Sequence, residues 1–418
     1  MFKKSIIIVL IQIFGSVLGL LTIYLIAGDM EPEVYSLTGI YTIMATITLT
    51  FSDLGIETTM TREALYWRLH GDEDKVREYT SQAILSRFLA FTVIVPGLII
   101  YALIINQAKY EGRYTLLLVL FVVGAAVNTI NNAMSLIVRS LGGYVFSQAA
   151  STLNNYILKF AGIGIYFLRG SYAYLVFYGL SSIPLSFVYV IKLHSLVDFR
   201  KMNIKTTLKK VIAGRYLWLK TDLDYFKNNA DGMLVSALFP AGVMGSYSIY
   251  KQLEQLSKNV VEGFFDVLSQ HTVKYKGQKD ELVKQEKRIK KARNVIIAMI
   301  IATICVFSIH PRLFVELIHL GKYQSIDLML YCILLVTIAH VIGKFEINAI
   351  AFFGTSKMNF NIGVAIFGIS CLSYVIVMIM PSIYGVLSQR IIIYVITSIL
   401  SIVLFEKNKE EFYTKVLK

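Results

Sequence analysis

Long apolar runs alternate with short polar connectors along the whole chain. Each run is about 20 residues long, which is the length that an α-helix needs to cross the hydrocarbon of a bilayer. The alternation predicts an all-α membrane protein with about twelve transmembrane helices and no attached soluble domain. The predicted spans are 5–27, 35–58, 83–105, 115–137, 144–168, 173–193, 214–239, 244–270, 294–316, 325–348, 358–380 and 383–405.

The first run directly follows Lys3 and Lys4, so a secretory signal peptide is an alternative interpretation. The run is too long for the apolar region of a typical signal peptide, and no small-x-small cleavage pattern precedes Asp29. We therefore expect an uncleaved first helix.

Composition and charge agree with a membrane protein. Apolar residues make up 56% of the chain and charged residues only 16%, a balance that a soluble protein of 418 residues would not show. The net charge of +14 would suggest nucleic acid as a partner of a soluble protein. Here the basic residues cluster between the apolar runs instead, so we expect no nucleic acid partner.

The basic residues are unevenly divided between the two sides of the predicted membrane. The connector 271–293 alone holds nine of them, and the basic connector 194–213 lies on the same side as both termini. The other side has only Lys109, Arg113, Arg169, Arg312 and Lys322. Because basic residues are retained in the cytoplasm, we predict cytoplasmic termini and a multi-pass protein of the cell inner membrane.

Two predicted spans, 214–239 and 244–270, carry charged residues. In each span, four residues of alternating charge recur every three or four positions and so share one helical face. They are Lys220, Asp224, Lys227 and Asp231 in the first span, and Lys251, Glu254, Lys258 and Glu262 in the second. A charge that faces lipid near the bilayer centre costs about 2.5–3.5 kcal/mol, so the two stripes indicate the wall of a hydrophilic cavity. An amphipathic hairpin on the cytoplasmic surface is the alternative, and it would leave ten spans.

Other polar residues lie inside apolar spans. Those that we expect to line the cavity are Asp53, Asn128, Asn131, Asn132 and Lys159. Lys159 is too deep in its span to reach the membrane surface, whereas Arg87 and Lys344 lie near span ends and can extend their charges to the interface. We therefore interpret Arg87 and Lys344 as structural. Glu346 and Arg390 are further charged residues of the tenth and twelfth spans.

The predicted cavity has an excess of cations. The five lysines that we assign to it suit an anionic ligand such as a diphosphate or an acidic sugar, because ammonium groups act as point charges toward phosphate. They are Lys159, Lys220, Lys227, Lys251 and Lys258. The carboxylates are candidates for coupling to an H⁺ or Na⁺ gradient, because burial and neighbouring charges tune how readily they bind a cation. They are Asp53, Asp224, Asp231, Glu254 and Glu262.

No catalytic residue, metal site or cofactor is predicted. The three cysteines, Cys305, Cys332 and Cys371, lie inside apolar runs with no metal-ligand spacing. The chain has no phosphate-binding G-x-x-x-x-G-K-[ST] sequence, so it carries no ATPase site of that type.

The connector 194–213 divides six spans from six, which predicts an N-terminal bundle, 1–200, and a C-terminal bundle, 201–418. Several segments then resemble a known family. Asp53–Glu63 (DLGIETTMTRE) is similar to the end of the second helix of polysaccharide (Wzx-type) flippases. The resemblance continues over 71–87, and Asp231–Val235 and Gly242–Tyr247 resemble the start of the C-terminal half in that family.

The resemblance covers the whole chain in length and span number. It implies the multidrug/oligosaccharidyl-lipid/polysaccharide (MOP) exporter superfamily, with two six-helix bundles in the V shape of MATE transporters. Such proteins move undecaprenyl-diphosphate-linked oligosaccharide repeat units of the O-antigen type from the cytoplasmic to the periplasmic leaflet by alternating access, with ion antiport. In that superfamily the first two helices of each bundle line the cavity, which favours 214–239 and 244–270 as true spans.

The resemblance also implies partners. They are the lipid-linked oligosaccharide with its polyprenyl diphosphate, the membrane, a polysaccharide polymerase and other assembly proteins.

Three other functions are open. A multidrug exporter of the same superfamily would have the same fold, but for cationic drugs its cavity should be acidic. A membrane polysaccharide polymerase or ligase usually needs a large outward loop with acid/base residues, and the outward connectors here are short. A structural scaffold would leave the polar residues inside the spans unexplained.

Overall fold

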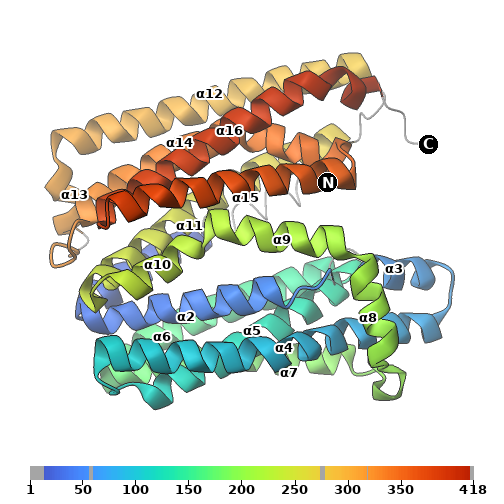
Figure 1. The fold of residues 1–418 in the computed structure, drawn as a ribbon, viewed down its shortest axis with the longest axis horizontal. Coiled ribbons are helices and arrows are strands. Elements are labelled where there is room, and N and C mark those ends of the chain that lie inside the picture. The colour runs from blue at the N-terminus through green and yellow to red at the C-terminus, as the bar shows by residue number, and fades with distance from the viewer. Residues whose placement is uncertain (1–13, 56–59, 274–277, 318, 415–418) are drawn as a thin grey trace. The chain divides into compact units, whose positions relative to one another are not determined.

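The computed structural model describes residues 14–55, 60–273, 278–317 and 319–414 (Figure 1). Every regular element in these ranges is helical, which confirms the prediction of an all-α protein. The α-helices are α2 (Pro32–Phe51), α3 (Thr61–Leu69), α4 (Glu73–Tyr110), α5 (Thr115–Ser140), α6 (Tyr144–Leu180), α7 (Ile183–Leu193), α8 (Ile204–Ala213), α9 (Arg215–Asn228), α10 (Ala230–Leu238), α11 (Ala241–Val273), α12 (Lys279–Ile309), α13 (Pro311–Leu317), α14 (Ile326–Phe353), α15 (Ser356–Ile379) and α16 (Ile383–Thr414). A π-helical turn, η1, covers Ile23–Ala27, and a 3₁₀ turn, η3, covers Phe199–Lys201.

Eight helical stretches of the described chain are long and apolar enough to cross a membrane. They match nine predicted spans, because the stretch Ala149–Leu193 holds two of them. The described part of the first predicted span is the shorter apolar helix Phe14–Ala27. The two remaining spans are the charged segments 214–239 and 244–270.

The fifth and sixth predicted spans meet at Gly170, whose φ of 80° favours glycine. A Cβ atom on Gly162 would lie 3.6 Å from the ring of Phe177. A straight helix would place these residues about 22 Å apart, so the chain reverses direction at Gly170. The predicted boundary between the two spans is therefore correct.

The chain divides into two compact units. Unit 1 comprises Met1–Ser36 and Gly242–Lys418, and unit 2 comprises Leu37–Ala241. The bundle limits 1–200 and 201–418 stay a prediction from the repeat pattern.

Within unit 2, the charged segment 214–239 forms the consecutive helices α9 and α10, which run lengthwise beside α2. The ring of Tyr225 in α9 lies 5.1 Å from that of Phe51 at the end of α2. Farther along, a Cβ on Gly232 in α10 would lie 3.3 Å from the side chain of Ile43. The segment thus covers the same depth as an apolar span.

The two ends of this segment also lie at opposite ends of α4. Just before α9, Lys210 pairs with Glu78 of α4 at 3.2 Å, and after α10 the carbonyl of Phe239 accepts a hydrogen bond from Lys109. Glu78 and Lys109 are about 46 Å apart along a helix, which is more than the thickness of the hydrocarbon. This packing favours a span over a hairpin on the surface.

Within unit 1, the charged helix α11 packs lengthwise on α14 and α16. Ser257 of α11 lies 3.0 Å from Thr337 of α14, and Phe265 belongs to a buried apolar cluster with Phe345 of α14 and Phe405 of α16. The helices α14 and α16 touch closely at Gly343, where a Cβ would lie 2.8 Å from the backbone of Ser398. Close helix contacts at small residues are typical of membrane bundles. The inner face of α11 is therefore buried against apolar spans.

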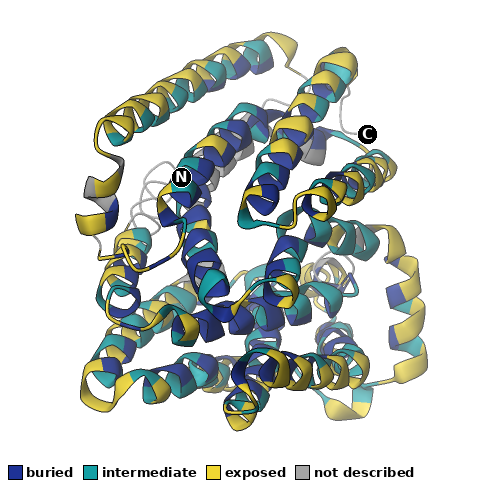
Figure 2. Ribbon diagram, turned by 60° about the vertical axis from the view of Figure 1, so that its left-hand side comes forward, coloured by how far each residue is buried: buried dark blue, intermediate teal, exposed yellow. Residues whose placement is uncertain are grey.

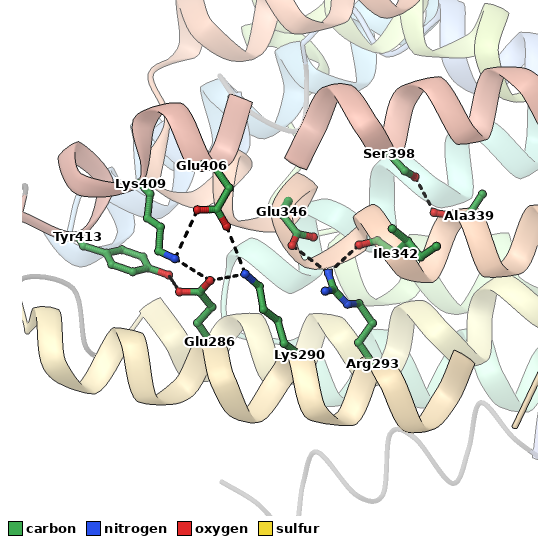
Figure 3. A network of polar contacts seen from close by, with 10 residues as sticks. All are labelled: Glu286, Lys290, Arg293, Ala339, Ile342, Glu346, Ser398, Glu406, Lys409 and Tyr413. Atoms are coloured by element: carbon green, nitrogen blue, oxygen red, sulfur yellow. Dashed lines mark hydrogen bonds and ion pairs between the residues drawn. The ribbon is translucent and has the colours of Figure 1, made fainter. Parts of the chain in front are cut away.

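The helix α12 is held mainly by its polar first half. Glu286 of α12 pairs with Lys409 of α16 at 2.9 Å and accepts a hydrogen bond from Tyr413 at 3.0 Å (Figure 3). Arg293 donates to Glu346 of α14 at 3.0 Å. In contrast, no residue of the apolar stretch of α12, all of which the structure describes, is buried (Figure 2).

Candidate functional site

A cluster of buried charges lies inside unit 1, where α11 faces α16. It consists of Glu254 and Lys258 from α11 and of Arg390 and Tyr394 from α16. Their exposed fractions are 1%, 8%, 0% and 3%. Glu254 and Lys258 are four residues apart, as are Arg390 and Tyr394, so each helix presents its pair on one face.

One carboxylate oxygen binds both cations. Arg390 Nη2 and Lys258 Nζ each donate to Oε1 of Glu254, and Lys258 also donates to the hydroxyl of Tyr394. The ring of Tyr394 lies 4.1 Å from Lys258 Nζ and 5.1 Å from Arg390 Cζ, measured to its centroid. The ring thus stabilises both cations through its π face.

The cluster carries one more positive than negative charge. Among the described residues, Oε2 of Glu254 has no hydrogen bond partner. Lys258, with 8% of its surface exposed, is the most accessible of the three charged residues. A buried site with two cations and one carboxylate can bind an anionic group that replaces the carboxylate.

Residues of α14 lie near Tyr394 of this cluster and near Tyr250 of α11, one turn before Glu254. The ring of His340 lies 6.1 Å from that of Tyr394, and the hydroxyl of Tyr250 lies 3.6 Å from the sulfur of Cys332. The two other cysteines, Cys305 and Cys371, are exposed on the helix surface.

A second charged pair lies inside unit 2, at the end of α2. Arg87 of α4, 1% exposed, pairs with Asp53 at 3.1 Å and also donates to Ser52 Oγ at 2.7 Å and to the carbonyl of Leu49 at 3.0 Å. Asp53 follows α2, which ends at Phe51, seven residues before the predicted end of that span. Arg87 therefore binds the carbonyl end of α2 and Asp53 together. Its charge is buried in this pair and does not extend to the membrane interface as its position near a span end suggested.

The first charged stripe is interrupted. Lys220 and Asp224 pair at 2.9 Å on α9, and Lys227 lies half-buried one turn later. The helix then breaks at Asn229. Asp231 is the second residue of α10, where it is 1% exposed and accepts a hydrogen bond from the backbone of Gly232 at 2.9 Å. Asp231 is thus buried, unlike the rest of its stripe.

The other predicted residues lie in different places. Asn131 is buried between α5 and α7, where it donates to the carbonyl of Ser182 at 2.6 Å and accepts from Ser186 at 2.8 Å. Asn128, Asn132, Lys159 and Lys251 are half-buried. Glu262 is in α11, but its side chain lies outside the part of the chain that the structure describes. The ligand and coupling roles of all these residues stay predictions.

Arg390 and Tyr394 were not predicted as site residues from the sequence. The available signal was an arginine inside an apolar span. An arginine inside a membrane costs free energy unless it has a partner. The sequence separation of 136 residues between Arg390 and Glu254 concealed that partner.

Neither a protein-family model nor a curated protein sequence matches the chain. Solved structures do match. An inward-facing multidrug resistance MATE family transporter of the MOP superfamily superposes with a TM-score of 0.72 at 12% identity, over 96% of each chain. An outward-facing transporter of the same description gives a TM-score of 0.58 at 14% identity, over 97% of this chain and 96% of that one.

A third match is a MOP superfamily transporter from Pyrococcus furiosus, described as having a binding pocket of reverse polarity that suggests a different function. Its TM-score is 0.58 at 15% identity, over 99% of this chain and 97% of the other. The chain therefore has the MATE-like fold of MOP superfamily transporters, as predicted.

Proposed function

We propose that this protein is a flippase that moves polyprenyl-diphosphate-linked oligosaccharides from the cytoplasmic to the periplasmic leaflet of the inner membrane. Two observations support transport by alternating access. The fold is that of MOP superfamily transporters, and solved proteins with this fold include an inward-facing and an outward-facing form.

The proposal of an anionic cargo rests on the buried cluster of Arg390, Lys258 and Glu254. A diphosphate has the charge and the acceptor oxygens to take the place of the Glu254 carboxylate on both cations. Lys258, the most exposed of the three, would meet the phosphate first, and Arg390 would then bind it with two N–H groups. The prenyl tail would stay in lipid, and polysaccharide polymerase and other assembly proteins would act on the delivered sugar.

Coupling to an H⁺ or Na⁺ gradient is part of the proposal. Asp231 is the carboxylate best placed for it in unit 2, since it is buried at the start of α10 next to a helix break. An ion that binds there would favour one conformation and so reset the protein after each cargo is released.

A multidrug exporter is the second candidate, because two of the matched structures are multidrug resistance transporters. The charge of the site distinguishes the two functions. A cationic drug would be repelled by an excess of positive charge, whereas a diphosphate would be attracted.

Transport by the purified protein in vesicles tests the proposal. The cargo is a fluorescent polyprenyl-diphosphate oligosaccharide, and its arrival in the other leaflet is followed with a membrane-impermeant quencher. We expect Lys258→Gln and Arg390→Gln each to lower the initial rate at least about tenfold, since a hydrogen bond to a charged group contributes about 1.5–3 kcal/mol. Lys407→Gln, an exposed cation on the same helix as Arg390, is the control and should keep the normal rate.

Ethidium transport in the same vesicles separates the two candidates. Export of ethidium without movement of the oligosaccharide would replace the flippase with a drug exporter. Normal oligosaccharide transport by both Gln variants would remove the cluster from the cargo path.

A further inference from the structure

The connector between α7 and α9 contains an amphipathic helix, α8 (Ile204–Ala213), where the sequence pattern indicated only a basic loop. The side chain of Asn203 accepts a hydrogen bond from the backbone of Thr206 at 3.1 Å and so caps the start of the helix. Gly214 ends α8 and at the same time precedes α9. The connector is therefore an ordered element with defined faces.

The position of α8 follows from its contacts with the first turns of α4. Lys210 pairs with Glu78 at 3.2 Å, donates to Gln82 and lies 3.5 Å from the ring centroid of Tyr79. All three α4 residues come directly before the predicted span 83–105, so α8 lies at the level where α4 enters the membrane. Figure 1 shows α8 crossing α4 steeply instead of running beside it. A helix with this position and direction lies along a membrane surface.

The faces of α8 differ sharply in chemistry. Thr207 and Val211, 0% and 7% exposed, point into unit 2. On the neighbouring face, three apolar residues at four-residue spacing are exposed, and no other part of the described chain covers this exposed surface. They are Ile204, Leu208 and Ile212, with exposed fractions of 55%, 47% and 59%.

Two cations border this apolar stripe. At 100° per residue, Lys205 and Lys209 follow directly after the stripe around the helix, and both are exposed. Neither forms an ion pair with another residue in the described ranges. An apolar stripe edged by lysines is complementary to a bilayer surface with anionic headgroups.

We propose that α8 is an in-plane membrane helix that inserts Ile204, Leu208 and Ile212 into the leaflet on the predicted cytoplasmic side. Lys205 and Lys209 bind the phosphates of anionic phospholipids there. The bilayer is the occupant because α8 lies at membrane level and its open face combines apolar and basic residues. The inference uses the membrane-spanning fold and does not depend on which cargo is carried.

The membrane contact also fixes the start of α9. Only Gly214 separates the two helices, and the indole N–H of Trp218 in α9 donates to the carbonyl of Val211 in α8 at 3.2 Å. Trp218 and Val211 belong to the same apolar cluster. Anionic lipid that holds α8 thus also positions α9, which carries Lys220 and Lys227.

Depth measurements in vesicles test this inference without a transport assay. The full-length protein, with its three native cysteines replaced, receives a fluorescent label at Leu208→Cys or, as the matched control, at Ala213→Cys. Ala213 is exposed on the opposite side of α8. In vesicles that contain phosphatidylglycerol, brominated lipid should quench the label at position 208 at least twofold more than the label at 213. Aqueous iodide should show the reverse order.

Charge removal tests the lipid class. With Lys205→Gln and Lys209→Gln in the same chain, lipid quenching at position 208 should fall in phosphatidylglycerol vesicles to the level found in phosphatidylcholine vesicles. Equal iodide quenching at 208 and 213 would overturn the membrane contact. Protection of position 208 from iodide without lipid quenching would also overturn it, since a protein surface would then cover α8. Quenching that is the same in both lipids before the lysines are changed would overturn the preference for anionic lipid.

Discussion

At the scale of single residues, Glu254 is the one negative charge of a cluster that buries two cations. Each of the three charged side chains is at least nine-tenths buried, so none of them is compensated by bulk water. Removing one partner of a buried ion pair leaves an uncompensated charge and costs about 3–5 kcal/mol. The net charge that remains in the cluster should therefore decide how much each substitution destabilises unit 1.

We predict that Glu254→Gln destabilises the protein more than Arg390→Gln. The first substitution leaves two buried cations without a carboxylate, whereas the second leaves the Glu254–Lys258 pair, which is neutral. Thermal unfolding of the purified protein in detergent measures the difference. The double variant Glu254→Gln, Arg390→Gln has one buried cation and should unfold between wild type and Glu254→Gln.

An unfolding temperature for Arg390→Gln below that of Glu254→Gln would contradict this charge balance. Lys407→Gln controls for the loss of an exposed cation and should unfold with the wild-type protein.

Part of this cluster follows from the sequence. The spacing of four residues between Glu254 and Lys258 predicts an ion pair on one helix face, and the structure has that pair. The contribution of Arg390 does not follow, because contacts between distant helices depend on how the helices cross. The same holds for Arg87, which was expected to reach the membrane interface but is buried against Asp53, a residue that was expected in the cavity wall.

At the scale of elements, α12 depends on contacts at its polar end. Glu286 is 3% exposed and lies before the predicted span 294–316, where Lys290, Lys409 and Tyr413 bind it. Burial acts to raise the pKa of Glu286, but the hydrogen bonds from Lys290 and Lys409 outweigh it and hold the pKa below its ordinary value of 4.5. The ionised form of Glu286 therefore stabilises the attachment of α12 to α16.

We predict that Glu286→Gln loosens the first half of α12 at neutral pH. Hydrogen exchange of the backbone in residues 279–293 should become at least tenfold faster, since hydrogen bonds to a charged group of about 1.5–3 kcal/mol are weakened. Because the folded pKa is lowered, the stabilisation in the wild-type protein is complete above pH 4.5 and is lost as the pH falls through the folded value. After correction for intrinsic exchange rates, the exchange of the wild-type protein should approach that of the variant only below pH 4.5.

Glu281→Gln is the matched control on the same helix. Glu281 is more exposed and, among the described residues, its one ion pair is with Lys284 at 3.5 Å, so its loss should change exchange little. Equal acceleration in both variants would show that the helix responds to any lost carboxylate and not to the contacts of Glu286.

The helix positions were largely predictable, and the exceptions have physical reasons. Apolar runs fix the spans to within a turn at most ends, as for α5 and α15. The break at Asn229 inside 214–239 was not predicted. A break is recognised from the sequence where the apolar periodicity of a helix is interrupted, and this polar segment has no such periodicity. The amphipathic α8 was missed because ten residues with three lysines have the composition of a basic loop.

At the scale of the whole molecule, the sequence predicts the number of spans better than their chemistry. Eight apolar stretches could be recognised from length and hydropathy alone. The charged segments 214–239 and 244–270 could not, because their charges lower the hydropathy, although some of these charges pair within α9 and α11 and one pairs with Arg390 of α16. Only the packing of α9 and α10 beside α2, and of α11 against α14 and α16, places them at membrane depth.

The side of the membrane on which α10 joins α11 decides between spans and a surface hairpin. Pro240 lies at this junction and is exposed. If both segments cross the membrane, a membrane-impermeant thiol reagent should label Pro240→Cys from the periplasmic side, as it should Arg312→Cys. The same reagent should label Lys407→Cys only from the cytoplasmic side, because that residue follows the last span and the positive charge predicts a cytoplasmic C-terminus. Labelling of Pro240→Cys together with Lys407→Cys would instead put the hairpin in the cytoplasm. Glu254 and Lys258 would then lie outside the bilayer and apart from Arg390, which is in the last apolar span. The buried cationic site would not exist, and the flippase proposal would lose its main support.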